Sequence, residues 1–324
     1  MNFLIIGLGS AGQRHARTIR SEFPSSNIYI FRGEHYTGLI SSDLQKIDNY
    51  LDPVQFYGLH ELNDLKKPKQ NYDLTVIATP IANHFSHASS IWNFSNRILI
   101  EKPITFYRED AEKLLQRAIL DKKILLVGYQ HTFNPILNKV KSHYKKSKPW
   151  NHFECEFSEY LIDMNPFREM GVHHLADPKG GNVFLALSHE INFLFQLLPN
   201  SWEMFEGELK TSHTIGNALD ICKLRGGFKH LESNLEISIS LNFDNREKRR
   251  NGVLRNSNLE LKWNLIDKNL QTNNNLTTFL YDTDYLFKKQ LQFVLAKQKF
   301  DKEILNSLVR AVDIVRLNSK LAVS

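Results

Sequence analysis

Hydrophobic residues in the first 128 positions occur in short runs that alternate with amphipathic segments. Short apolar runs bounded by turn residues are typical of buried parallel strands, and amphipathic segments between them are typical of helices. We therefore expect a doubly wound parallel sheet with right-handed connections. The expected strands are 3–6, 28–32, 54–57, 74–78, 97–101 and 124–128. The expected helices follow residue 12, lie at 41–47 and near 61–65, begin near residue 83, and span 108–121.

The hydrophobic pattern changes after residue 128. One-sided strands of period two imply a mainly antiparallel sheet with one face against its helices and a polar face that can pair with a second subunit. We predict α/β folding for residues 1–128 and a substrate-binding and oligomerisation α+β domain for 129–324, with a C-terminal helix able to pack back on the first domain. Helices are expected at 133–146, 182–197, 284–299 and 302–321, and strands at 150–161, 235–243 and 259–266.

The stretch from Phe3 to His15, FLIIGLGSAGQRH, joins a buried strand to a glycine-rich turn and the start of a helix. The spacing of Gly7, Gly9 and Gly12 is the G-x-G-x-x-G arrangement that binds a dinucleotide pyrophosphate. The first glycine allows a sharp turn, the second lets the backbone approach the phosphates, and the third lets the helix lie close to the strand. We therefore predict a Rossmann-type nucleotide domain, with phosphates at the helix N-terminus.

The end of the second expected strand bears on the choice between NAD and NADP. An acidic residue usually binds the adenosine ribose hydroxyls there, whereas this chain has Phe31, Arg32 and Gly33, with Glu34 just beyond. An arginine can hold a 2′-phosphate, so we expect NADP at least as readily as NAD. An exposed arginine at a strand end is an equal alternative.

Composition excludes several classes of protein. The 324 residues are 42% hydrophobic and 23% charged, which is typical of a globular protein of two domains. Because there is no apolar run of eighteen residues and no signal peptide pattern, we expect a cytoplasmic protein with no membrane partner. Cys155 and Cys222 cannot make a disulfide framework or a metal site, so no metal is predicted.

The net charge of +6 raises the question of nucleic acid binding. The basic runs at 141–148 and 246–250 lack interleaved stacking aromatics, and we interpret them as solvated surface. We therefore expect no nucleic acid partner. A basic protein nevertheless favours anionic small molecules such as sugar nucleotides.

Two residues are candidates for moving a proton. Lys102 follows a sheet strand and precedes Pro103, and a lysine desolvated beside a nicotinamide ring can act as a general acid or base. His189 is a polar exception in an almost wholly apolar helix, and histidine is the commonest proton shuttle. A surface lysine and a satisfied core histidine are the corresponding structural interpretations.

Five segments in order resemble the signatures of the glucose-fructose oxidoreductase, inositol dehydrogenase and rhizopine catabolism (Gfo/Idh/MocA) family. They are GLGSAGQRH at 7–15, ATPIANH at 78–84, EKP at 101–103, GYQHTFNP at 128–135 and GGNVFLALSHEINF at 180–193. The resemblance implies an NAD- or NADP-dependent oxidoreductase acting on sugars, cyclitols or nucleotide sugars, as a homodimer or homotetramer through the C-terminal sheet. The SHEIN segment and EYLIDMNPFRE at 159–169 are similar to members from bacterial surface-glycan biosynthesis, especially that of nonulosonic acids.

The resemblance also assigns residues. Lys102 and His189 match the catalytic lysine and histidine of the family. The residues implied to bind the cofactor are Gly7, Gly9, Ser10, Ala11, Gly12, Arg14, His15, Arg32, Ala78, Thr79, Pro80, His84, Glu101, Lys102 and Gln130. Those implied to bind the substrate are Lys102, Tyr129, His131, Ser188 and Asn192.

The chain departs from the family pattern at three positions. Members usually carry an aspartate four residues before the histidine and an acidic residue three after it, where this chain has Leu185 and Asn192, and Thr132 replaces a signature arginine. His131, Asp163, His173, His174 or Glu190 are candidates to compensate. Two alternatives therefore stay open: an impaired NAD(P)- or sugar-binding protein, and an enzyme that retains its cofactor and performs elimination or hydrolysis through transient oxidation.

Overall fold

The structure, a computed structural model, describes residues 1–32, 38–41, 45–48, 51–65, 70–147, 149–161, 181–212, 219–230 and 233–322. The chain forms two compact units. Unit 1 comprises Met1–Gln130 and Asp282–Val315, and unit 2 comprises His131–Tyr281 and Arg316–Ser324. The last helix thus contributes residues to both units.

Unit 1 is built on a six-stranded parallel sheet with the strand order β5-β2-β1-β6-β7-β8. Its strands are β1 (Asn2–Ile6), β2 (Asn27–Phe31), β5 (His60–Glu61), β6 (Leu74–Ile77), β7 (Arg97–Ile100) and β8 (Ile124–Val127), and a separate pair is β3 (Leu39–Ile40) with β4 (Lys46–Asp48). The helices are α1 (Ser10–Glu22), α2 (Pro53–Phe56), α3 (His84–Ile91), α4 (Arg108–Leu120), α9 (Thr283–Ala296) and α10 (Lys302–Leu321).

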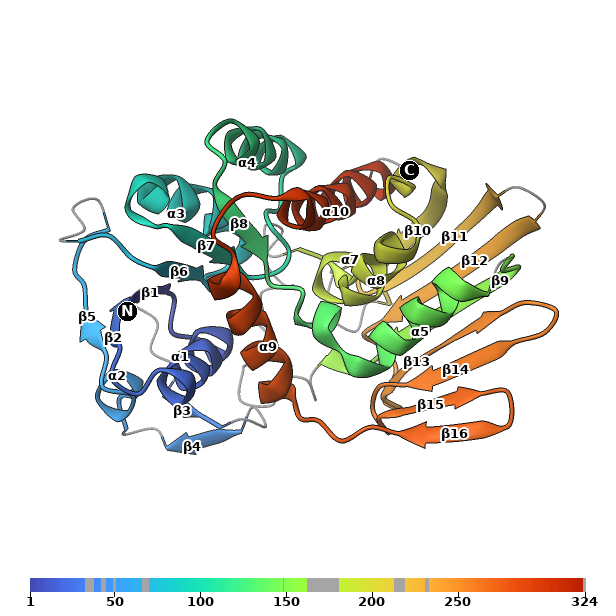
Figure 1. Ribbon diagram of the computed structural model, residues 1–324, viewed down its shortest axis with the longest axis horizontal. Helices are drawn as coiled ribbons and strands as arrows, with labels where there is room; N and C mark the ends of the chain where they lie inside the picture. The colour runs from blue at the N-terminus through green and yellow to red at the C-terminus, as the bar shows by residue number, and fades with distance from the viewer. Residues whose placement is uncertain are drawn as a thin grey trace. The chain divides into compact units, whose positions relative to one another are not determined.

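Helices cover both faces of this sheet, with α3 and α4 on one side and α1 and α9 on the other (Figure 1). The central strands are buried along their length because both faces are covered, as in Phe3, Ile5 and Val76. The predicted doubly wound parallel sheet is confirmed.

Residues 41–65 differ from the prediction. The expected strand at 54–57 is the helix α2, because Asp52 caps it by accepting from Val54 N at 2.9 Å and Pro53 supplies a preset first helical residue. The expected helix near 61–65 is wrong at its start, since His60–Glu61 pair with β2 as the edge strand β5. The expected helix at 41–47 is wrong at its end, because Lys46–Asp48 form strand β4. Its residues 42–44 lie outside the described part.

Unit 2 contains an eight-stranded sheet with the order β10-β11-β12-β9-β13-β14-β15-β16. All its pairs are antiparallel except β12 with β9. The strands are β9 (His152–Ser158), β10 (Phe205–Lys210), β11 (Ile221–His230), β12 (Ser233–Asn242), β13 (Arg249–Arg255), β14 (Glu260–Asn264), β15 (Asn269–Thr272) and β16 (Asn275–Thr278). The helices are α5 (Pro135–Lys146), α7 (Val183–Ala186) and α8 (His189–Leu197).

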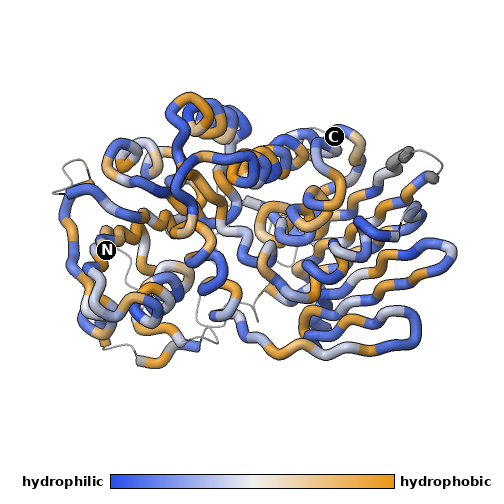
Figure 2. Tube along the Cα trace, in the orientation of Figure 1, coloured by the Kyte–Doolittle hydropathy of each residue, from blue (hydrophilic) through white to orange (hydrophobic). Residues whose placement is uncertain are grey.

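The strands of this sheet alternate between hydrophobic and hydrophilic residues along their length (Figure 2). The apolar side chains pack on one face against α7 and α8, for example Phe153 and Trp263 against Phe193. The opposite face carries polar residues such as Glu154 and Lys262. The expected mainly antiparallel sheet with one polar face is thereby confirmed.

The segment expected to be one helix at 182–197 is two. The hydrogen bonds of α7 end with Leu187 N to Val183 O, and those of α8 begin with Asn192 N to Ser188 O. Between them the Ser188 hydroxyl donates to the Leu185 carbonyl at 2.8 Å, and a serine hydroxyl that binds a nearby carbonyl competes with the helical backbone bonds. His189 therefore begins a new helix.

None of the helices in the described ranges is both long enough and apolar enough to cross a membrane.

Candidate functional site

The glycine loop between β1 and α1 has the geometry of a phosphate cradle. Gly7 has a φ of +95°, and a Cβ there would lie 2.7 Å from the Ala78 carbonyl oxygen. A Cβ on Gly12 would lie 2.0 Å from the Gly7 oxygen, whereas one on Gly9 would meet nothing within 4 Å. The first and third glycines are therefore required by packing, and the second leaves open space where a ligand can approach.

The N-terminus of α1 suits an anion. Gly9 caps the helix without a side-chain hydrogen bond, and the first turn contains no acidic residue. The positive end of the helix dipole is thus not neutralised by its own sequence. This arrangement fits the pyrophosphate of NAD or NADP.

The loop is held by Gln13, a residue that the sequence did not single out. Its amide nitrogen donates to Leu8 O at 3.2 Å and Gly38 O at 2.7 Å, and its oxygen accepts from Ile40 N at 2.8 Å. The side chain is fully buried. The sequence shows that a glutamine follows the third glycine directly. It does not show that this glutamine binds backbone groups 25 and 27 residues further along the chain.

Two alanine substitutions separate cofactor binding from folding. Gly9→Ala is expected to fold normally, because its Cβ meets no protein atom, but to weaken NADH binding by about tenfold or more, because it fills the space left for the phosphates. Gly12→Ala is expected to lower the melting temperature because its Cβ overlaps the Gly7 oxygen. Thermal unfolding with and without NADH distinguishes the two, and a Gly9→Ala variant with unchanged NADH affinity contradicts this assignment of the loop.

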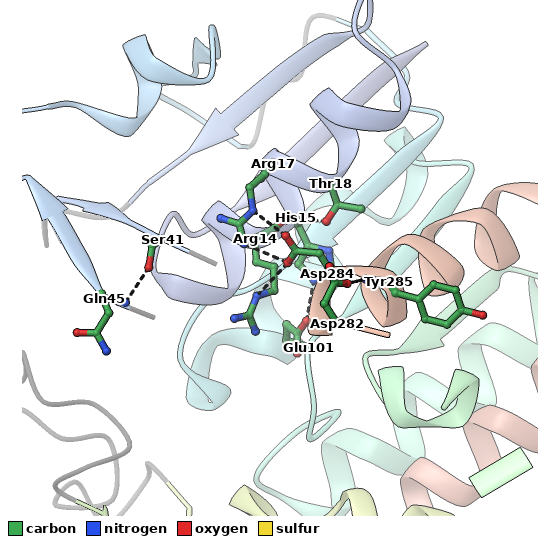
Figure 3. Close-up of polar contacts among 10 residues, drawn as sticks. All are labelled: Arg14, His15, Arg17, Thr18, Ser41, Gln45, Glu101, Asp282, Asp284 and Tyr285. Carbon is green, nitrogen blue, oxygen red and sulfur yellow. Dashed lines mark hydrogen bonds and ion pairs between the residues drawn. The ribbon is translucent and has the colours of Figure 1, made fainter. Parts of the chain in front are cut away.

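Glu101 connects the glycine-loop helix to the end of β7. His15 Nε2 lies 2.7 Å from Glu101 Oε1 (Figure 3). Lys102 N donates to Glu101 Oε2 at 3.3 Å. Burial acts to raise the pKa of Glu101, but the hydrogen bond and charge of His15, together with Lys102, hold that pKa below its usual value. The carboxylate is therefore ionised at neutral pH, and it fixes the backbone at the predicted catalytic lysine.

His84 fixes the same region from the other side. Its Nε2 lies 2.9 Å from Thr79 O and its Nδ1 lies 3.0 Å from Pro103 O. Burial lowers the pKa of His84 although both carbonyls favour the charged ring. The ring thus ties the loop after β6 to the loop after β7, where the Lys102–Pro103 peptide is cis. The residues after these parallel strands line the ligand crevice of an open sheet.

Helix α9 supports the glycine-loop helix although the two are far apart in sequence. Asp284 accepts from Arg17 Nε at 3.1 Å and lies 3.8 Å from Arg14 Nε (Figure 3). Phe287 packs edge-on against His15 with ring centroids 5.0 Å apart. Two predicted cofactor residues, Arg14 and His15, are therefore oriented by the C-terminal part of unit 1.

The remaining predicted cofactor residues of unit 1 also lie at strand ends or turns. Thr79 Oγ1 is 3.0 Å from His87 Nδ1, and Gln130 Oε1 is buried with no hydrogen-bond partner among the described residues. Arg32 is bound by Asp52 and Glu61, so it is not an isolated surface arginine. Ser10 and Ala11 begin α1, and Ala78 and Pro80 flank Thr79. Tyr129, which was predicted to bind the substrate, is buried just after β8.

In unit 2, two predicted residues contact each other. The rings of His131 and His189 are 4.8 Å apart at an interplanar angle of 66°. Arg250 donates from Nη1 to His131 Nε2 at 2.9 Å and from Nε to Glu190 Oε1 at 2.7 Å. Because a guanidinium only donates, His131 Nε2 accepts in this contact. His131 is thus held by Arg250 beside His189.

The three departures from the family pattern have local explanations in unit 2. Thr132 Oγ1 accepts from Asn192 Nδ2 at 3.2 Å and from Gln196 Nε2 at 3.4 Å, so two of the departures contact each other through neutral hydrogen bonds. Leu185 is buried in α7, ahead of the break in the helix. A carboxylate there would not lie one helical turn before His189 on a continuous helix.

The interpretation of the run 246–250 as solvated surface is wrong for Arg250. Arg250 lies on β13, and its side chain is 14% exposed. Its Cζ stacks over Phe157, 4.4 Å from the ring centroid. Glu190, named as a candidate to compensate, is committed to this arginine. The other candidates, Asp163, His173 and His174, and the strand-end residue Glu34, lie outside the described residues.

No group of three histidine, cysteine or acidic side chains in the described residues could hold a metal ion. Cys155 and Cys222 are buried and unlinked. Burial raises the pKa of Cys222 to about 12, so this thiol is not a nucleophile at neutral pH.

The parallel sheet, the glycine loop and the residues after β7 define a dinucleotide-binding protein of the Rossmann class. Residues 1–129 match the family model described as the oxidoreductase family with an NAD-binding Rossmann fold, Gfo/Idh/MocA. This match confirms the resemblance seen in the sequence over residues 1–129, the NAD-binding Rossmann part of the Gfo/Idh/MocA oxidoreductases.

Solved structures share the fold over nearly the whole chain. UDP-N-acetylglucosamine 3-dehydrogenase GnnA from Acidithiobacillus ferrooxidans is 13% identical with a TM-score of 0.72, covering 100% of this chain and 97% of that one. The 3-ketoreductase KijD10 from Actinomadura kijaniata, in complex with NADP and TDP-benzene, is 15% identical with a TM-score of 0.73, covering 98% and 96%. GenD2 from gentamicin A biosynthesis, in complex with NAD, is 12% identical with a TM-score of 0.74, covering 100% and 94%.

Proposed function

We propose that this protein transfers a hydride between NAD(P) and a carbon of a sugar, cyclitol or nucleotide sugar. The observation that carries the proposal is the chain of contacts from His15 through Glu101 to the backbone of Lys102. These contacts fix the backbone of Lys102, whose side chain can carry a proton, to the helix that begins at the phosphate cradle. When bound, the nicotinamide supplies the hydride chemistry, and the protein must supply the proton transfer.

Lys102 and His189 are the proposed proton carriers. Lys102 lies in unit 1 after β7, where Glu101 and His84 fix the surrounding backbone. His189 begins α8 in unit 2 and is packed against His131, whose Nε2 is occupied by Arg250. His189 is therefore the better candidate of the two histidines for exchanging a proton with a substrate hydroxyl.

Nucleotide sugars are the proposed substrate class. One similar structure is named a UDP-N-acetylglucosamine 3-dehydrogenase, and another is a 3-ketoreductase in complex with TDP-benzene. The excess of basic residues, with a net charge of +6, favours anionic substrates such as nucleoside diphosphate sugars. Within this class we propose a role in bacterial surface-glycan biosynthesis, supported by the sequence similarity of SHEIN and the segment at 159–169.

The proposal is tested with a panel of UDP- and TDP-sugars, with free sugars and cyclitols as the comparison set. Absorbance of the reduced nicotinamide is followed in both directions with NAD(H) and NADP(H). We expect turnover with at least one nucleotide sugar and much slower turnover with the matching free sugar. If either nucleotide binds but no compound changes its redox state, the impaired-protein alternative is correct.

A product formed without net change in the nucleotide supports the transient-oxidation alternative instead, and mass spectrometry of the sugar detects it. Homodimer or homotetramer formation through the unit 2 sheet and the cytoplasmic location stay predictions, of which the first is measured by light scattering on the eluting protein.

A further inference from the structure

Arg32 is held by two carboxylates at the end of the strand that reaches the adenosine ribose in dinucleotide-binding folds. Its Nε and Nη2 lie 2.6 and 3.2 Å from the two oxygens of Glu61. Its Nη1 and Nη2 lie 3.0 and 3.2 Å from the two oxygens of Asp52. Both pairs are bidentate, the strongest arrangement that arginine makes with a carboxylate.

Both carboxylates are positioned by backbone contacts. Asp52 caps α2 by accepting from Val54 N, and Glu61 lies on β5, where it pairs in register with Ile30 of β2. The next residue, Leu62, donates its N–H to Ile30 O at 2.7 Å. The guanidinium is therefore held by groups that local structure fixes in place, and these three side chains form what we call the Arg32 clamp.

The Arg32 clamp carries a net negative charge, because one guanidinium faces two carboxylates. The hydrogen bonds and charges of Glu61 and Asp52 raise the pKa of Arg32. The guanidinium therefore stays charged, and the two carboxylates of the clamp compensate its charge. The carboxyl groups remain 29% and 39% exposed, so their oxygens can still accept from ribose hydroxyls. A 2′-phosphate, with nearly two negative charges, would have to displace a carboxylate or lie beside two of them.

We propose that the Arg32 clamp makes this protein select NAD(H) over NADP(H), with Asp52 and Glu61 as the specificity-determining residues. The inference reverses the expectation drawn from Arg32 alone, and it rests on the assignment of the glycine loop as the cofactor site. The arginine, which by itself favours a 2′-phosphate, is neutralised here by residues 20 and 29 positions further along the chain.

The experiment measures the dissociation constants of NADH and NADPH by fluorescence titration, so its readout does not depend on knowing the substrate. We expect wild-type protein to bind NADH at least about tenfold more tightly than NADPH. The double variant Asp52→Asn with Glu61→Gln should bind NADPH more tightly than wild type does, because Arg32 becomes free to pair with the phosphate. Asparagine still caps α2, and glutamine keeps the side-chain length, so both changes preserve the fold.

Two further variants make the test specific. Arg32→Ala should not gain NADPH affinity, because it leaves two unneutralised carboxylates. The double variant Glu208→Gln with Glu260→Gln, which removes two carboxylates of unit 2 that pair with Lys210 and Lys262, changes the total charge equally and should leave the NADH to NADPH ratio unchanged. The preference of wild type should also shrink as salt concentration rises.

Equal binding of the two nucleotides by wild type, or an unchanged ratio in the double variant, overturns the selectivity proposal while leaving the oxidoreductase assignment intact. Failure of wild-type protein to bind either nucleotide contradicts the cofactor site itself and with it the proposed function.

Discussion

Replacing Lys102 with methionine is expected to lower kcat for hydride transfer by about 10²–10⁴-fold, the usual contribution of a general acid or base. Methionine keeps the length of the side chain but cannot exchange a proton. The backbone at this position is fixed by Glu101 and by the contact of His84 with Pro103, so the loop should keep its conformation. The measurement is the single-turnover rate with saturating nucleotide and sugar, together with NADH affinity.

Lys102→Arg distinguishes charge from proton transfer. An arginine keeps the positive charge but is not deprotonated in proteins, so this variant should lose turnover as well and should not regain it at high pH. Lys113→Met is the matched control, because Lys113 is an exposed residue of α4 that pairs with Asp110 on the same helix. A Lys102→Met enzyme with the wild-type rate would leave His189 as the proton carrier.

The glycine loop and the parallel sheet could be predicted because their signals are local. Gly7, Gly9 and Gly12 lie within six residues, and short, mainly apolar runs of four or five residues predict the buried strands. The errors at 41–65 came from short elements, where periodicity is too brief to decide between helix and strand. The Asp52–Pro53 pair is a local signal for a helix start, because aspartate caps a helix and proline suits its first position.

The site was less predictable where it depends on contacts distant in sequence. The sequence left Arg32 either as a phosphate ligand or as an exposed arginine, because its partners, Asp52 and Glu61, belong to short elements whose type the pattern did not predict. Arg250 looked like one member of a basic surface run, yet the first residues of β13 bring it to His131 and Glu190. The order of charged residues along the sequence does not predict which of them pair in the folded protein.

The buried pair of Arg250 and Glu190 is expected to stabilise unit 2 only as a pair. Glu190 is 4% exposed and Arg250 14% exposed, and Glu190 Oε2 has no hydrogen-bond partner among the described residues. Arg250→Met should therefore cost about 3–5 kcal/mol in the free energy of unfolding, because it leaves a buried carboxylate without its cation. The measurement is urea unfolding followed by tryptophan fluorescence, since Trp150, Trp202 and Trp263 all belong to unit 2.

The double variant Arg250→Met with Glu190→Leu should regain most of that stability, because replacing both partners of a buried ion pair by apolar groups is often neutral or stabilising. Equal instability of the single and double variants would mean that the loss arises from the packing of Arg250 on Phe157. A stable double variant that turns over slowly would show that the pair also positions His131, whose Nε2 accepts from Arg250, and does not serve the fold alone.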